Sequence, residues 1–180
     1  MFTEPASALP AFRRREIFEQ TLQRARHMSA AGKSQTAILT CLVTGAELGA
    51  GDGAVCSILV LDKDGLLRNG ASPNLPRDYL DAIDRIKPDP KVGTCAAAAA
   101  TGAVVVTADF CADDKWAELR HLPMQLGFVG AWSTPIIGAG GKVLGTFGTY
   151  FRERREPTSD EVAGVGSLAE VAATVLAPES

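Results

Sequence analysis

Cys95 stands in the most unusual stretch of this sequence, VGTCAAAAATG at residues 92–102. We expect a short helix that begins at Cys95, with Thr94 able to cap it and Gly102 able to end it. A thiol at a helix N-terminus has a lowered pKa and can act as a nucleophile, and the free N–H groups there can hold an anion. Burial in apolar surroundings raises the thiol pKa, so the sequence leaves this balance open.

Catalysis by a thiol usually needs a second thiol that resolves the oxidised product. The other cysteines are Cys41, Cys56 and Cys111, and no two of the four form a CxxC pair. The sequence holds two histidines, which are too few and too scattered to predict a zinc site. We therefore expect free thiols in a reducing compartment, with no metal centre.

The composition indicates one globular domain with an ordinary core. The chain has 180 residues, of which 46% are hydrophobic and 22% charged. Its net charge of −3 gives no general attraction to nucleic acid or to an anionic membrane. No apolar run is long enough to predict a membrane span, and MFTEPASALPAFRRREIF at the N-terminus lacks the apolar centre of a signal peptide. We expect a cytoplasmic protein.

The elements that would position these residues follow from the spacing of apolar residues and from the turns. Two hairpins are predicted, one formed by 54–62 and 66–72 and the other by 128–138 and 142–153, and a short strand is predicted over 103–109. Helices are predicted over 11–31, 34–48, 74–86, 95–101, 112–127 (irregular) and 157–177. Hairpins imply an antiparallel sheet, and the helices must cover its faces, so the predicted fold is an α+β sandwich.

Several of these segments, in order, resemble the consensus of GAF domains from bacterial sensor histidine kinases and cyclic-di-GMP turnover proteins. The resemblance spans 35–177 and rests on GASPNLPRDYLDAI, VGTCAAAAATG, GAWSTPI and GKVLGTFGTYFRERREPTSDEV. It implies a PAS-like fold, with a central antiparallel sheet of five or six strands. Terminal helices would cover one face, and a ligand pocket would lie under helices and loops on the other.

GAF domains generally bind small molecules, such as cyclic nucleotides, haem, bilins, small anions or metabolites, and report binding to an output domain or partner. The resemblance identifies neither the ligand nor a cofactor. It places the helix at Cys95 and the segments of Trp116 and Trp132 around a common cavity. The ligand-binding residues that we expect are Thr94, Cys95, Ala96, Asp109, Trp116, Trp132 and Ser133. Each also has a simpler role open to it, as core, as a strand end or as a solvated loop carboxylate.

The resemblance divides the chain into a signalling and dimerisation helix at 1–33 and a GAF domain at 34–177, which includes the C-terminal helix 158–177. GAF domains commonly form homodimers through such helices. Independent support comes from two seams of small and apolar residues at helical spacing, which could build a four-helix bundle between two copies. The same seams could equally cover the sheet of one chain. The seams consist of Phe18, Leu22, Ala25 and Ser29, and of Val165, Leu168, Ala172 and Val175.

The function that we expect is a ligand-binding sensor that is not an enzyme. Two other functional classes are alternatives to it. Free methionine sulfoxide reductases share this fold, and one of their cysteines lies in a motif that matches Cys95. Their other cysteines would fall near DAIDRIKPDP and AELRHLPM, where this chain has none, and Ala96 replaces the usual glycine. A thiol-based redox sensor at Cys95 is a weaker form of this alternative. The second class is a dimerisation module without a ligand.

Overall fold

A five-stranded antiparallel sheet forms the centre of the molecule, in a computed structural model that describes residues 9–178. The strands lie in the order β2-β1-β5-β4-β3. Their bounds are β1 Val55–Leu61, β2 Leu67–Ala71, β3 Val105–Thr107, β4 Gly130–Ile137 and β5 Val143–Phe151. The two predicted hairpins, β1–β2 and β4–β5, are confirmed, and the five-stranded alternative of the predicted sheet is the correct one.

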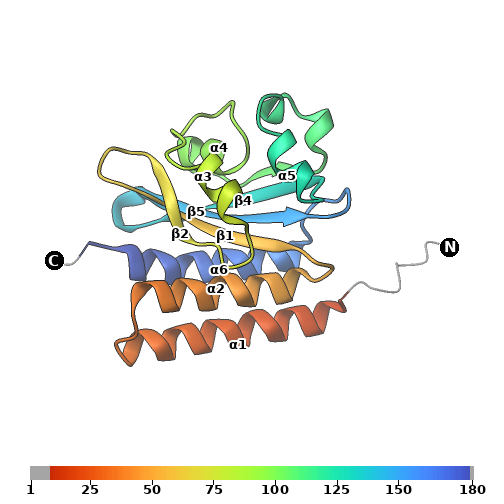
Figure 1. Cartoon of the computed structure of the whole chain (residues 1–180). Helices are drawn as coiled ribbons and strands as arrows, with labels where there is room; N and C mark the ends of the chain where they lie inside the picture. The colour runs from red at the N-terminus through yellow and green to blue at the C-terminus, as the bar shows by residue number, and fades with distance from the viewer. Residues whose placement is uncertain (1–8, 179–180) are drawn as a thin grey trace.

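Three long helices cover one face of the sheet: α1 Ala11–Ala30, α2 Gln35–Ala50 and α6 Ser159–Leu176. Figure 1 shows α2 and α6 against the sheet and α1 beneath them, as a further helical layer. Thr158 begins α6 with a capping box, because its hydroxyl accepts from Glu161 N–H while the Glu161 carboxylate accepts from Thr158 N–H. Within 9–178, no helix is both long and apolar enough to cross a membrane.

The other face carries short helices and loops. These are α3 Arg77–Ala82, α4 Cys95–Thr101, α5 His121–Gln125 and two 3-10 turns, η1 Phe110–Ala112 and η2 Asp114–Trp116. The helix predicted over 74–86 is shorter than expected, since the chain turns after Ala82 and Arg85 takes a positive φ of 67°. The irregular helix predicted over 112–127 is a series of short turns. The Asp113 side chain caps η2, and α5 begins only at His121, with Pro123 in its first turn, where proline is tolerated.

The two helical seams lie inside the chain. Phe18 and Ala25 of α1 and Val165, Leu168 and Ala172 of α6 are buried in the core that α1, α2 and α6 share with the sheet. Of the two alternatives for the seams, this burial agrees with the one in which they pack within one chain, while Ser29 at the end of the first seam is exposed. Residues 1–8 lie outside the described residues, so part of the predicted segment 1–33 and of the N-terminal stretch behind the localisation prediction has no structural counterpart here.

Candidate functional site

The pleat of the sheet separates two cores. On β4, Trp132 and Ile136 point to the helical face and pack with Phe147 of β5, while Ala131 points to the other face and packs with Tyr150. This alternation follows from the two-residue period of a strand. A candidate site on the face opposite the long helices can therefore include only alternate residues of each strand.

A small cavity of about 30 Å³ lies on that opposite face, between the sheet, α3, α4 and η2. One water-sized group needs about 10–15 Å³ on this scale, so the cavity has room for two or three such groups. Its walls are mainly aliphatic, formed by Leu59, Leu67, Ile83, Ile86, Leu119 and Leu122. The cavity is therefore apolar and nearly filled.

Five neutral polar groups also line the cavity. Thr94 and Cys95 come from the start of α4, Tyr79 from α3, Tyr150 from β5 and Trp116 from the end of η2. Tyr79 and Tyr150 join α3 to the sheet through a hydrogen bond of 2.5 Å between their hydroxyl oxygens. Trp116 is buried with an exposed fraction of 5%, and its Nε1–H has no hydrogen-bond partner among residues 9–178.

Cys95 is held against the sheet through hydroxyl groups. Its sulfur lies 3.1 Å from Ser133 Oγ, and Ser133 Oγ donates to Thr94 Oγ1 at 2.9 Å. The expected Thr94 side-chain cap is therefore wrong, because this hydroxyl bonds to β4 and not to the backbone of α4. Gly102 does end α4, in the left-handed conformation.

The approach of Cys95 to the sheet depends on Gly148, which sequence reasoning did not single out. Gly148 pairs with Ser57 on one side and with Ser133 on the other. A Cβ at Gly148 would lie 3.0 Å from Cys95 Sγ, closer than real Cβ atoms normally come. A glycine in the middle of the β-rich segment GTFGTYF was the available signal, because an interior glycine often marks a close approach.

The pKa of the Cys95 thiol is raised above its ordinary value. Burial is the main cause, and the hydroxyl groups around the sulfur oppose it only in part. The question that the sequence left open is thus decided in favour of a protonated thiol at neutral pH. Burial also raises the pKa of Tyr79 and of Tyr150, so both remain neutral phenols.

The predicted site residues are only partly brought together. Thr94, Cys95, Ala96 and Trp116 line the cavity, and Ser133 lies beneath it, in contact with Cys95. The prediction that Trp132 lines the cavity is wrong. Trp132 immediately precedes Ser133 on β4, so its side chain points to the opposite face of the sheet and packs in the core beneath the long helices. Tyr79 and Tyr150 were not predicted as site residues, although the imperfect alternation in FGTYFRE could have indicated the inward direction of Tyr150.

Asp109 does not line the cavity. Its carboxylate accepts from Cys111 N–H at 2.9 Å, which caps η1, and it pairs with Arg154 at 3.2 Å. Asp109 therefore supports the loop structure next to the site. No group of three potential metal ligands is found in the described part of the chain.

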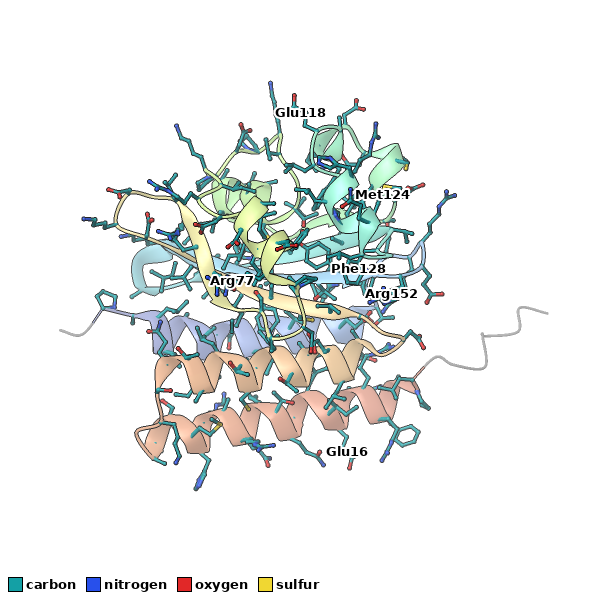
Figure 2. The ribbon with its side chains drawn as sticks, in the orientation of Figure 1. Glu16, Arg77, Glu118, Met124, Phe128 and Arg152 are labelled. Atoms are coloured by element: carbon teal, nitrogen blue, oxygen red, sulfur yellow. The ribbon has the colours of Figure 1, made fainter. Side chains whose placement is uncertain are left out.

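Arg152 holds the segment that follows α5 in place. Figure 2 shows its side chain beside Phe128, and the guanidinium carbon lies 4.5 Å from the centre of that ring. Arg152 also donates to Leu126 O at 2.8 Å and to Gly53 O at 3.1 Å. These contacts attach the segment after α5 to the start of β1, and Phe128 in turn packs against Tyr150 of the cavity.

A five-stranded antiparallel sheet with long helices on one face, and with a cavity under short helices and loops on the other, is the PAS-like arrangement that the resemblance implied. The model of the GAF domain family matches residues 13–177, so this chain belongs to the GAF domain family. The match begins within α1.

A curated relative has a stated role. The chain is 34% identical over 152 residues to the methyl sulfide methyltransferase-associated sensor of Methanosarcina acetivorans, which covers 83% of this chain. The aligned region is only 15% of that sensor, so the chain corresponds to a small part of it.

Solved structures share the fold at low identity. The GAF domain of a phosphoenolpyruvate-protein phosphotransferase from Coxiella burnetii superposes with a TM-score of 0.75 at 20% identity, covering 92% of this chain and 94% of that one. The free methionine-R-sulfoxide reductase of Neisseria meningitidis, in complex with its substrate, gives 0.70 at 18% identity, covering 98% and 96%. The fold is thus common to sensors and to a reductase, and the fold alone does not separate them.

Proposed function

We propose that this chain is a sensory module that binds a small molecule in the cavity beneath α4 and reports the binding through its long helices. The observation that carries the proposal is the cavity itself, which residues with neutral polar groups from α3, α4 and β5 line together with Trp116, whose buried Nε1–H has no partner among the described residues. A buried donor without a partner is costly in a folded protein, and a ligand acceptor would remove that cost. The 34% identity to part of a sensor supports the same class.

Strand β5 offers a physical route from the cavity to the helices. Tyr150 lines the cavity, and its neighbour Phe151 faces the helical core. The Arg155 guanidinium lies 3.9 Å from the centre of the Phe151 ring and holds the Glu161 carboxylate at the start of α6. A ligand that moves Tyr150 would therefore displace β5 and shift this ion pair.

The test is a thermal-shift screen of metabolites and nucleotides, together with an absorbance spectrum and native mass spectrometry of the purified protein. A true ligand raises the melting temperature, and saturation at about 100 times its Kd adds about 2.7 kcal/mol of stability. Replacement of Trp116 by Phe should reduce the effect, whereas Trp132→Phe, on the opposite face, should not. Hydrogen exchange at the first turn of α6 should also change on binding. A ligand that acts equally on both tryptophan variants would contradict the cavity as the site.

The output belongs to the proposal as well. From the resemblance, the partner is a signalling protein such as a histidine kinase or a cyclic-di-GMP turnover protein, and the chain itself carries no catalytic step. Dimerisation through the terminal helices remains a prediction. With both seams mostly buried in the chain, a dimer would use the outer surfaces of the terminal helices, where Phe12 of α1 is exposed. Sedimentation at micromolar concentration tests this, and a monomer throughout would exclude it.

The positions of the other cysteines argue against the alternative that this chain is a methionine sulfoxide reductase. Cys56 faces the helical core on the other side of the sheet from Cys95, and Cys111 is exposed beside Met124. Neither cysteine is in place to resolve an oxidised Cys95 without rearrangement of the fold. A thioredoxin-coupled assay with free methionine sulfoxide should give no turnover. Turnover that Cys95→Ser abolishes would establish the enzyme and overturn the sensor.

A further inference from the structure

The cavity beneath α4 contains no charge among the described residues that line it. Its polar groups are the hydroxyls of Thr94, Tyr79 and Tyr150, the Cys95 thiol and the Trp116 indole N–H. The two phenols and the thiol stay neutral, since burial raises their pKa values. An ion placed here would lose its hydration and gain no counter-charge, which is strongly unfavourable.

Two hydrogen-bond donors of the residues that line the cavity lack an acceptor among the hydrogen bonds of the described residues. Tyr79 and Tyr150 share one hydrogen bond, so whichever oxygen accepts keeps its own O–H free. The Trp116 N–H is unpartnered, and the ring edge next to it faces Gly93, where a Cβ would lie 3.7 Å from Cζ2. Gly93 itself lines the cavity. A bound molecule is thus required to accept hydrogen bonds and to present apolar surface elsewhere.

Size limits the ligand further. The cavity measures about 30 Å³, and its aliphatic walls belong to the hydrophobic core on this face of the sheet. This space accommodates about two or three water-sized groups without movement of the walls, so a molecule of about four non-hydrogen atoms requires only a small adjustment of them. A nucleotide or a tetrapyrrole would require α3 and α4 to separate, which the Tyr79–Tyr150 hydrogen bond and the buried face of α4 oppose.

We propose that the ligand is a small neutral molecule, mostly apolar, with one strong hydrogen-bond acceptor such as a carbonyl or sulfoxide oxygen. The inference rests on the proposed function and names the chemical class that its cavity accepts. Carboxylates, phosphates and ammonium compounds are rejected by the same cavity. At a ceiling of about 1.5 kcal/mol per non-hydrogen atom, a ligand of about four such atoms binds with a Kd of about 0.04 mM at the tightest, so titrations into the millimolar range are appropriate.

The experiment is an NMR titration of the two indole N–H signals in ¹⁵N-labelled protein. The probes are acetone and dimethyl sulfoxide, which are neutral, and acetate and guanidinium, which are charged and similar in size, all at constant ionic strength. We expect acetone or dimethyl sulfoxide to shift the Trp116 signal saturably. The Trp132 signal, from the other face of the sheet, is the internal control, and Trp116→Phe assigns the two signals.

Two variants change the cavity in opposite directions. Ala96→Leu places a larger side chain into it and should weaken acetone binding at least tenfold. Leu119→Ala, at a partly buried wall, should enlarge it and improve binding of a bulkier ketone such as cyclohexanone relative to acetone. Because Leu119 is only partly buried, this second variant keeps the test available if Ala96→Leu does not fold.

The possible results separate this inference from the proposed function. A saturable Trp116 shift by acetate or guanidinium, or by a nucleotide from the wider screen, without one by either neutral probe, overturns the chemical class and leaves a ligand-binding cavity. No saturable Trp116 shift by any compound overturns both. Equal shifts of both indole signals by the neutral probes indicate unspecific solvent effects and also overturn the inference.

Discussion

Cys95 illustrates how much a residue's chemistry depends on its surroundings. Its place at the start of a helix favours a thiolate, but α4 is only seven residues long and the sulfur is pressed onto the sheet at Ser133. Burial outweighs the neighbouring hydroxyl groups and raises the thiol pKa. The residue is thus a neutral wall of the cavity at neutral pH.

Alkylation rates provide the check on this assignment. With iodoacetamide at pH 7 to 8, we expect the exposed Cys111 to react first and Cys95 to react more slowly by on the order of tenfold or more, because only a thiolate is nucleophilic. Peptide mapping by mass spectrometry after timed quenching measures both rates. A Cys95 rate equal to or above that of Cys111 would contradict the raised pKa and revive the redox-sensor alternative.

Ser133 and Thr134 are neighbouring buried hydroxyls with opposite expected contributions to stability. Ser133 bonds to Thr94 and contacts Cys95, whereas the Thr134 hydroxyl has no partner in the described residues. Ser133→Ala should lower the free energy of unfolding by about 1–2 kcal/mol, and Thr134→Val should be neutral or stabilising. Urea unfolding of both variants measures this, and a Thr134→Val loss as large as that of Ser133→Ala would show an unseen bond at Thr134.

At the scale of elements, the start of α6 is held by one buried ion pair. The Glu161 carboxylate is fully buried and accepts two hydrogen bonds from the Arg155 guanidinium, at 2.7 and 2.8 Å, and one from Thr158 N–H. Burial alone would raise the Glu161 pKa, but these charge-assisted bonds outweigh it and hold the pKa below its ordinary value. Arg14 of α1 joins the group through Thr158 Oγ1 and Gly49 O.

Replacement of Glu161 by Gln should lower the free energy of unfolding at pH 7 by about 3–5 kcal/mol, because it leaves the Arg155 charge partly buried without its partner. Glu153→Gln is the matched control. Its carboxylate lies 3.9 Å from the same guanidinium but is half exposed, so the loss should stay below about 1 kcal/mol. Chemical denaturation of both variants measures the difference, and equal losses would contradict a special role for the buried carboxylate.

The same carboxylate predicts a pH dependence. Since the folded-state pKa of Glu161 is lowered, its contribution is complete above the unfolded value of about 4.3 and is lost as the pH falls through the folded-state pKa. The wild type should therefore lose stability on acidification below about pH 4.3, and Glu161→Gln should lose less over the same interval. Thermal melts between pH 3 and 7 measure this. Parallel curves for the two proteins would show that Glu161 does not carry the effect.

At the scale of the whole molecule, α1 packs closely because glycines on two other helices receive Phe18. Its ring contacts the positions where Gly49 of α2 and Gly164 of α6 would carry a Cβ. At Gly49 that Cβ would lie 2.7 Å from the ring, and at Gly164 it would overlap the ring. Helix α1 is thus held as an outer layer against α2 and α6 through this contact.

Gly164→Ala should lower the free energy of unfolding by about 1–3 kcal/mol, because the added methyl group forces Phe18 or α1 to move. Gly166→Ala, two positions along the same helix, meets nothing within 4 Å and should stabilise the protein by up to about 1 kcal/mol through helix propensity. Denaturation curves and hydrogen exchange within α1 measure both effects. Stabilisation by both substitutions would contradict the described packing of α1.

Much of the architecture was available from the sequence. The two hairpins, the end of α4 at Gly102 and the buried stripe of α2 are local patterns, and local patterns report hydrogen bonding and burial within one element. The short segments between α3 and α5 were predicted less well. Their form depends on side-chain caps such as Asp113, and on packing of Phe110 and Trp116 against each other, which helical spacing does not reveal.

The sequence by itself determined the class of fold, because the hairpins and helices are local patterns, and its resemblance to GAF domains placed Thr94, Cys95 and Trp116 around one cavity. Only the tertiary structure decided which face each strand residue takes. The pleat put Tyr150 into the cavity and Trp132 into the helical core, since adjacent positions on a strand point in opposite directions. The tertiary structure also decided that the Cys95 thiol stays protonated and that both helical seams pack within one chain. Both outcomes depend on burial, and burial depends on contacts between elements that are distant in the chain.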